Sequence, residues 1–256
     1  MEKIMQNGNK HVGLSRLRKE YTAKLIIRCV IWIGCIILCL VHPDTFSVLE
    51  KGNFFRKFSI LHVLWLIWVL DMIQQLVPVK KHIALGSQKL FPQRFKPVRE
   101  KVNLQSLKKY IVSTTKAAYK VFILWAVVVA AIGALYLCGV IDRMFLFMFT
   151  VFFYVCDLIC VLVWCPFRLM MKNKCCTTCR IFNWDHLMMF SPLVFMGGFF
   201  SVSLFVLSLL VWCLWEACVL IFPERFWEFS NEALKCSNCT DKLCIQYCQK
   251  LRKRGI

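Results

Sequence analysis

The sequence predicts an all-α protein: a polytopic membrane helix bundle of about five spans, with a basic cytoplasmic loop and a Cys-rich C-terminal tail. Hydrophobic residues make up 59% of the 256 residues, above the ~45–50% of soluble domains. They come in long blocks rather than in alternation. The formal net charge of +19 cannot lie in hydrocarbon, so loops and termini must carry it.

Five apolar stretches are long enough to begin or complete a span at about 1.5 Å of rise per residue. They occupy residues 25–41, 58–77, 120–141, 144–170 and 188–222, and together form a predicted transmembrane bundle over 25–222. The N-terminal segment 1–24 is basic and lacks the small-residue exit of a cleavable signal. We therefore expect a multi-pass protein of the cell membrane with its N-terminus in the cytoplasm.

The loop 78–119 carries ten Lys or Arg residues against a single acid, Glu100. This excess predicts a cytoplasmic loop, and the helical spacing of apolar residues over 98–119 predicts a helix lying on the membrane surface. Anionic lipid is the expected partner. A soluble acidic redox partner or a membrane subunit is the alternative. Because lipid accounts for the charge, we do not expect nucleic-acid binding.

The predicted topology contains a conflict at the tail, residues 223–256. Five spans starting from a cytoplasmic N-terminus put the tail outside the cell. Its cysteines and its basic end, Arg252-Lys253-Arg254, favour the cytoplasm instead. A broken or re-entrant segment at Gly197-Gly198 would return the chain to the inner side. Five spans remain our prediction from the sequence.

Two groups of cysteines are candidate metal ligands. Four sulfurs fall within fifteen residues that begin at the inner end of the fourth span, and four lie in the tail with the spacing C-x2-C-x4-C-x3-C, close to that of a zinc knuckle. Either group suits zinc, and the first also suits a [4Fe–4S] cluster. Free thiols, disulfides in an external tail, and joint ligation by both groups are alternatives. The residues are Cys165, Cys175, Cys176 and Cys179, and Cys236, Cys239, Cys244 and Cys248.

Two acids within the predicted spans are candidate catalytic residues: Asp157 and Glu216. A carboxylate in hydrocarbon is costly, so we expect both to face the bundle interior and to be paired or protonated. Asp185 is predicted to cap the helix that follows it, with a role as proton donor or ligand as the alternative. Haem is not expected, because His42 and His62 lie at a membrane edge rather than buried on facing helices.

The pattern CPFR…CCTTCRIFNWD…MMFSP, together with the tail CSNCTDKLC, resembles an uncharacterised family of Cys-rich multi-spanning bacterial membrane proteins. The resemblance covers most of the chain and implies no function. Residues 164–167, where Cys165-Pro166 leaves a span, resemble the membrane-anchored polyferredoxin subunits of quinol dehydrogenases, although the Gly-rich flank of those subunits is absent. This resemblance implies an iron–sulfur site at the inner face.

Three functions remain open from the sequence. The first is a membrane redox protein whose Cys-ligated centre at the cytoplasmic face passes electrons to a quinone or a partner subunit. The second is a non-enzymatic scaffold or transport-linked subunit stapled by structural zinc. The third is thiol–disulfide exchange through Cys176 and Cys179. No phosphate loop, HExxH or Ser/His/Asp signature supports hydrolysis or nucleotide-driven transport.

Overall fold

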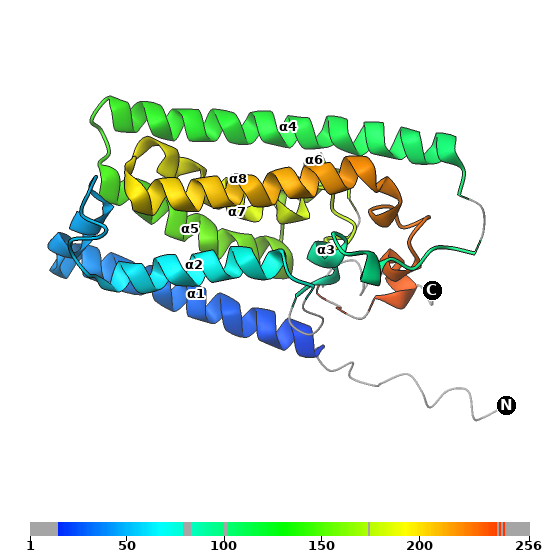
Figure 1. Cartoon of the computed structure of the whole chain (residues 1–256), viewed down its shortest axis with the longest axis horizontal. Coiled ribbons are helices and arrows are strands. Elements are labelled where there is room, and N and C mark those ends of the chain that lie inside the picture. Colours follow the sequence, from blue (N-terminus) through cyan, green and yellow to red (C-terminus); the bar gives the residue numbers. More distant parts are fainter. Residues whose placement is uncertain are drawn as a thin grey trace.

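The computed structural model describes residues 15–78, 83–99, 102–173 and 175–239, together with Asp241 and Leu243. This part of the chain is all-α, as predicted. Within it, four helices are long and apolar enough to cross a membrane, and a shorter apolar helix lies among them (Figure 1). The long helices are α1 (Arg16–Val41), α4 (Leu104–Leu137), α5 (Arg143–Leu162) and α8 (Gly198–Ile221); the shorter one is α2 (Ile60–Gln75).

Short helical elements connect the long helices and cover the ends of the bundle. The α-helical ones are α3 (Leu85–Gln88), α6 (Pro166–Met170) and α7 (Asp185–Phe190). The 3₁₀ turns are η1 (Pro43–Leu49), η2 (Pro92–Arg94), η3 (Phe182–Trp184), η4 (Ser191–Phe195), η5 (Pro223–Arg225), η6 (Glu232–Leu234) and η7 (Cys236–Asn238).

The bundle has two ends, and both described ends of the chain lie at the same one (Figure 1). We call it the basic end; it holds the start of α1, residues 83–99, the start of α4, residues 222–239, Asp241 and Leu243. There the Ser15 hydroxyl donates to the backbone oxygen of Asp241 at 2.6 Å. The backbone N–H of Leu85 donates to the Asp241 carboxylate at 2.7 Å.

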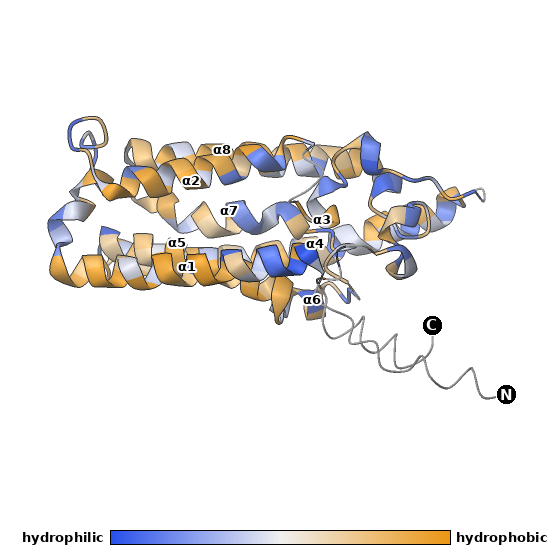
Figure 2. Ribbon diagram, turned by 90° about the horizontal axis from the view of Figure 1, so that it is seen from below, coloured by the Kyte–Doolittle hydropathy of each residue, from blue (hydrophilic) through white to orange (hydrophobic). Residues whose placement is uncertain are grey.

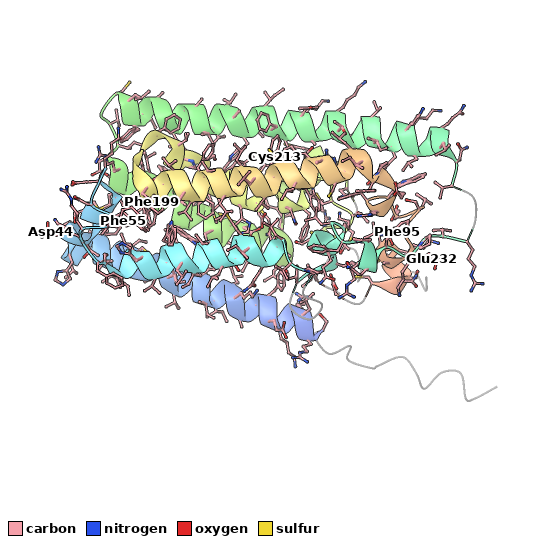
Figure 3. The ribbon with its side chains drawn as sticks, viewed as in Figure 1. Asp44, Phe55, Phe95, Phe199, Cys213 and Glu232 are labelled. Atoms are coloured by element: carbon pink, nitrogen blue, oxygen red, sulfur yellow. The ribbon has the colours of Figure 1, made fainter. Side chains whose placement is uncertain are left out.

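The opposite end, which we call the far end, consists of residues 42–59 and 138–143 and the turn at Gly197. Figure 3 shows Asp44, Phe55 and Phe199 at this end, and Phe95 and Glu232 at the basic end. Gly198 lies against the backbone of residues 49–51. Successive long helices therefore run between the two ends in alternating directions.

The predicted span 188–222 is divided in the structure. The short elements α7 and η4 run from the basic end toward the far end, and α8 returns from Gly198. Pro192 cannot donate a backbone hydrogen bond, and Gly197 and Gly198 have φ values of 66° and 82°, which interrupt a helix. This broken segment is the alternative raised from the sequence, and it brings the described tail back to the end where α1 begins.

Two other predicted boundaries also differ. The span 144–170 ends as a helix at Leu162, because Cys165 precedes a proline and is extended (φ −120°, ψ 118°) before α6 begins. The expected surface helix over 98–119 is instead the first part of the continuous helix α4. Tyr110 holds it in place by stacking on Trp227 and donating to the backbone oxygen of Phe226 at 3.2 Å.

Two hydrophobic clusters hold the fold together. The larger one fills the bundle around Trp68, where aromatic rings from α5, α7 and α8 meet. The smaller one lies at the basic end and includes Ile181, Trp184, Trp215 and Phe226. Figure 2 shows mostly hydrophobic residues along the long helices and hydrophilic residues concentrated in the segments at the ends.

Candidate functional site

A cavity of about 260 Å³ is lined by six cysteine side chains from three neighbouring segments. We call it the thiol cavity. Aromatic and thioether side chains form much of the remaining wall, among them Trp125, Phe153, Phe167 and Met188. The cysteines are Cys156 and Cys160 of α5, Cys165 before α6, and Cys175, Cys176 and Cys179 of the following loop.

Local backbone interactions hold the cysteine loop in shape. The Asn173 side chain donates to the backbone oxygen of Cys175 at 3.1 Å, and the Thr178 hydroxyl contacts both Asn173 and Cys175 at 3.0 Å. The N–H of Cys179 donates to the carbonyl of Cys176 at 2.9 Å. The loop is therefore a folded turn that presents three sulfurs to the cavity.

Two of the sulfurs lie within hydrogen-bonding reach of each other. The Cys160 thiol donates a hydrogen bond to the sulfur of Cys165, and both residues are half-buried reduced cysteines. Backbone N–H groups of Arg168 and Phe167, in the first turn of α6, also point at this sulfur. These donors favour the thiolate and lower the pKa of Cys165 to about 7, the Cys160 hydrogen bond contributing most.

The cysteine loop is anchored to α8 by a buried ion pair. Arg180 donates to both carboxylate oxygens of Glu216 at 2.6 and 2.5 Å, and Trp184 Nε1 donates to the same carboxylate at 2.8 Å. The Trp215 indole donates to the backbone oxygen of Arg180 at 2.8 Å. The expectation that Glu216 is paired is confirmed, and these contacts give it a structural role near the basic end.

Lys89 also holds the cysteine loop in place. Its side chain is 2% exposed, and its amine donates to the backbone oxygen of Cys179 at 2.9 Å beside the rings of Trp215 and Phe226. Burial disfavours the ammonium form and lowers the pKa of Lys89 to about 7. The loop thus packs into a hydrophobic core of its own.

A second, polar cavity of about 70 Å³ lies next to the thiol cavity. Its central group is Arg28 of α1, whose guanidinium lies 2.7 Å from Asp157 of α5 and 3.4 Å from Asp71 of α2. The guanidinium also donates to the backbone oxygen of Tyr154 at 2.8 Å and lies over that ring. Asp157 is therefore inside the bundle and paired, as expected.

Asp185 and His186, at the start of α7, complete the wall of the polar cavity. The amide of Gln75 donates to Asp185 Oδ2 at 3.1 Å, and Asp185 Oδ1 lies 3.3 Å from His186 Nδ1. The expectation that Asp185 caps the helix is wrong: α7 has no side-chain cap hydrogen bond, because the carboxylate turns toward Gln75 and His186.

The predicted metal ligands are brought together in part. Cys165, Cys175, Cys176 and Cys179 line one cavity. Among the residues that the structure describes, no three His, Cys, Asp or Glu side chains are close enough to hold a metal ion. In the tail, η7 contains Cys236 and leads into Cys239; Cys244 and Cys248 lie outside the described residues.

The tail and the cysteine loop are at the same end of the molecule, which joint ligation requires. Leu243 packs with Leu162 and Phe182 beside the thiol cavity. Both ring nitrogens of His62, at the far end, contact backbone atoms: Nδ1 lies 3.1 Å from the backbone nitrogen of Ser59, and Nε2 lies 2.8 Å from the backbone oxygen of Phe54.

Sequence reasoning missed two residues of the site. Arg28 lies inside the predicted span 25–41, and a cation at that position beside two intramembrane acids on other spans was the available signal. Cys160 was not among the predicted ligands. Its contact with Cys165 requires the chain to turn back at Cys165-Pro166, and no spacing rule predicts that turn.

No family model, curated protein or solved structure matches this chain.

Proposed function

We propose that the chain is a multi-pass membrane protein whose two described ends both face the cytoplasm. Large apolar side chains are exposed along the outer faces of the long helices; Leu40 and Leu137 are each 77% exposed and Leu220 is 65% exposed. Such surfaces suit lipid. The broken segment formed by α7 and η4 is buried between α5 and α8, the condition under which irregular backbone is tolerated at membrane depth.

The distribution of charge supports this orientation. The far end carries four basic and three acidic side chains, so its net charge is small: Lys51, Arg56, Lys57 and Arg143, with Asp44, Glu50 and Asp142. Among the residues that the structure describes, most of the remaining positive charge lies at the basic end, which is the arrangement expected of a cytoplasmic face. Anionic lipid headgroups would contact this face, and a soluble acidic redox partner would dock on it.

Within this frame, the function that the site supports best is dithiol oxidation coupled to quinone reduction. The observation that carries it is the contact between Cys160 and Cys165 at the wall of an apolar cavity. In the reaction, both S–H bonds break and one S–S bond forms. Two electrons and two protons pass to the quinone, which leaves as quinol.

The cavity wall suits a quinone ring. Trp125 and Phe153 offer aromatic faces for offset stacking, and Phe167 and Met188 add apolar surface. The two sulfurs are half-buried, so a lipid-soluble oxidant can reach them while bulk water is largely kept away. A thiolate at Cys165 is the form that reacts.

The scaffold hypothesis receives less support. It assumed that the loops lack a core and need zinc to hold them. The cysteine loop has a core through Ile181 and Trp184, an ion pair through Arg180 and a buried Lys89. The loop therefore does not need a metal ion to keep its shape.

Quinone reduction can be tested directly. The protein is reduced, placed in lipid nanodiscs and mixed with a short-chain ubiquinone; quinol is followed by absorbance and disulfides by peptide mass mapping. We expect one quinol per protein and a Cys160–Cys165 disulfide. Cys160→Ser and Cys165→Ser should each abolish both products.

The matched control is Cys213→Ser, which changes an exposed cysteine on α8 away from the cavity (Figure 3) and should leave both products unchanged. Absence of quinol from the reduced wild-type protein contradicts the proposal. So does quinol formation that persists in Cys160→Ser.

A soft metal centre in the same cavity is the second candidate. The four sulfurs predicted as ligands line that cavity, together with two more from α5. Binding of zinc or a [4Fe–4S] cluster would close the cysteine loop around the metal. Elemental analysis of protein purified without chelator tests it: stoichiometric zinc, or iron with a band near ~400 nm that dithionite bleaches, supports a metal centre. Metal-free protein argues against it.

Zinc binding by the tail stays a separate prediction, through Cys236, Cys239, Cys244 and Cys248. Metal should slow alkylation of these thiols, and a chelator should restore fast alkylation. Rapid alkylation of all four in metal-replete protein contradicts it.

A further inference from the structure

The thiol cavity and the polar cavity share a wall. Four residues line both of them: Asp157, Val161, Phe182 and Asp185. Two of the four are carboxylates, so each acid faces sulfur on one side and polar groups on the other. A carboxylate that lines both cavities can accept a proton from the thiol cavity and release it into the polar cavity.

The two acids differ in what holds them. Asp157 lies 2.7 Å from the guanidinium of Arg28, a cation that never gives up its proton. Within the described residues, the partners recorded for the Asp185 side chain are Gln75 and His186, neither of which carries a fixed charge. Asp185 is thus the shared acid that lies beside a titratable group, and the imidazole of His186 can gain or lose a proton next to it.

Buried polar atoms around Asp185 lack hydrogen bonds. Gln75 Oε1, Asp185 Oδ1 and His186 Nδ1 are all inaccessible and without a hydrogen-bond partner, although Oδ1 and Nδ1 are only 3.3 Å apart. Such atoms in a polar cavity are normally satisfied by water. A cavity of about 70 Å³ has room for a few water molecules, each of which needs about 10–15 Å³ on this measure.

The polar cavity extends from Asp185 toward the basic end. Its wall includes Tyr21 and Lys24 of α1 and Ser87 of α3. The Tyr21 hydroxyl accepts a hydrogen bond from the backbone N–H of Ala84, which lies in a segment of the basic end. Water in this cavity would link Asp185 to the side of the molecule that we assign to the cytoplasm.

From this arrangement we infer that Asp185 and His186 carry protons between the sulfurs of the thiol cavity and water at the basic end. The inference rests on the proposed dithiol chemistry. The protons released by Cys160 and Cys165 enter the relay, and the two protons gained by the quinol oxygens are drawn from it. The net reaction therefore stays dithiol plus quinone to disulfide plus quinol.

The relay has several charged neighbours that set its proton affinity. They come from α1, α2 and α5, and they include both signs of charge. These groups are Tyr21, Lys24 and Arg28 of α1, Asp71 of α2 and Asp157 of α5.

The test measures oxidation of the Cys160–Cys165 pair as a function of pH, with two oxidants in parallel. One is the short-chain ubiquinone, and the other is dithiodipyridine, a small disulfide that oxidises thiols without any quinone site. We expect Asp185→Asn to slow oxidation by both oxidants about a hundredfold near neutral pH and to flatten the pH profile. Added imidazole, a diffusible proton carrier, should restore part of the rate.

Asp44→Asn is the matched control, because it removes an exposed carboxylate at the far end that lines neither cavity. Its rate should stay close to wild type. His186→Gln, a second relay variant, should slow both oxidants as Asp185→Asn does. Circular dichroism and thermal unfolding identify any variant that misfolds.

The two oxidants separate the possible failures. Normal rates in Asp185→Asn with both oxidants overturn the relay, and so does an equal loss in Asp185→Asn and Asp44→Asn. A reduced wild-type protein that dithiodipyridine oxidises but ubiquinone does not overturns the quinone proposal. The relay is then judged on the dithiodipyridine rates alone.

Discussion

Arg28 of α1 and Asp157 of α5 form a buried ion pair 2.7 Å long that joins helices 129 residues apart in sequence. The Arg28 side chain is 9% exposed and the Asp157 side chain 19%. Two charges in such a place are tolerated because each compensates the other, with Asp71 and the Tyr154 carbonyl as further partners. The pair fixes α1 against α5 beside the thiol cavity.

Loss of one partner of this pair should be more damaging than loss of both. Arg28→Leu leaves Asp157 as an uncompensated charge and should destabilise the protein by about 3–5 kcal/mol. The double variant Arg28→Leu/Asp157→Leu should recover part of that loss. Unfolding free energies in mixed micelles give the comparison. Equal stabilities of the single and the double variant would show that the pair contributes no coupling.

Cys165 should alkylate as a low-pKa thiol. Its pKa is lowered to about 7 by the Cys160 hydrogen bond and the N–H groups of α6, so its thiolate fraction should reach one half near pH 7. An ordinary thiol reaches that point near ~8.5. Iodoacetamide kinetics resolved by peptide mass mapping measure the profile. In Cys160→Ala, which removes the donor, the midpoint should move toward higher pH.

Cys138, an exposed cysteine at the far end, is the internal reference for these kinetics. The alkylation rate of the Cys138 thiolate corrects the Cys165 data for the reactivity of iodoacetamide itself. If Cys165 and Cys138 share one pH profile, the hydrogen bond to Cys165 does not stabilise its thiolate.

Lys89 should make the folded state more stable as the pH rises. Burial lowers its pKa to about 7, while in the unfolded chain the pKa is near ~10.4. Between these values the unfolded state binds more protons, so stability increases with pH by up to ~1.4 kcal/mol per unit. Below pH 7 both states are protonated, and this contribution is constant.

Lys89→Met removes the titrating group and keeps much of its apolar length. The stability of wild type relative to Lys89→Met should therefore rise between about pH 7 and pH 9.5. Thermal unfolding of both proteins across this range isolates the effect from other groups. A constant difference would mean that the buried amine stays protonated.

Much of the helical fold could be predicted from the sequence, because long apolar blocks leave few alternatives to helices. The end of α1 at His42-Pro43 and the short turn before α5 follow from residues that stop helices. The division of the predicted span 188–222 into two segments could not be predicted, since hydropathy stays high across the whole stretch. Pro192 and the Gly197-Gly198 pair indicated where the helix breaks. Only the packed structure shows that the segment before the break is long enough to run from the basic end to the far end.

The site could be predicted only in part. Close spacing indicated that Cys165 belongs with the cysteine loop, and the cost of burial indicated that Asp157 needs a partner. The identity of that partner depends on which helices are neighbours, and helix pairing cannot be read from composition. The contact of Cys160 with Cys165 and the position of Asp185 between two cavities are likewise products of tertiary structure.

The path of the chain predicts that the C-terminal tail and the N-terminus share one side of the membrane. In a bacterial host, green fluorescent protein fused after Ile256 should fluoresce, because it folds in the cytoplasm and fails to fold after export. Alkaline phosphatase inserted at Gly52, in the far-end loop, should be active, since it requires an oxidising exterior. Green fluorescent protein at Gly52 is the control and should be dark. A dark C-terminal fusion would mean an odd number of crossings, so that α7 and η4 do not form a returning segment and the tail cysteines face the oxidising side.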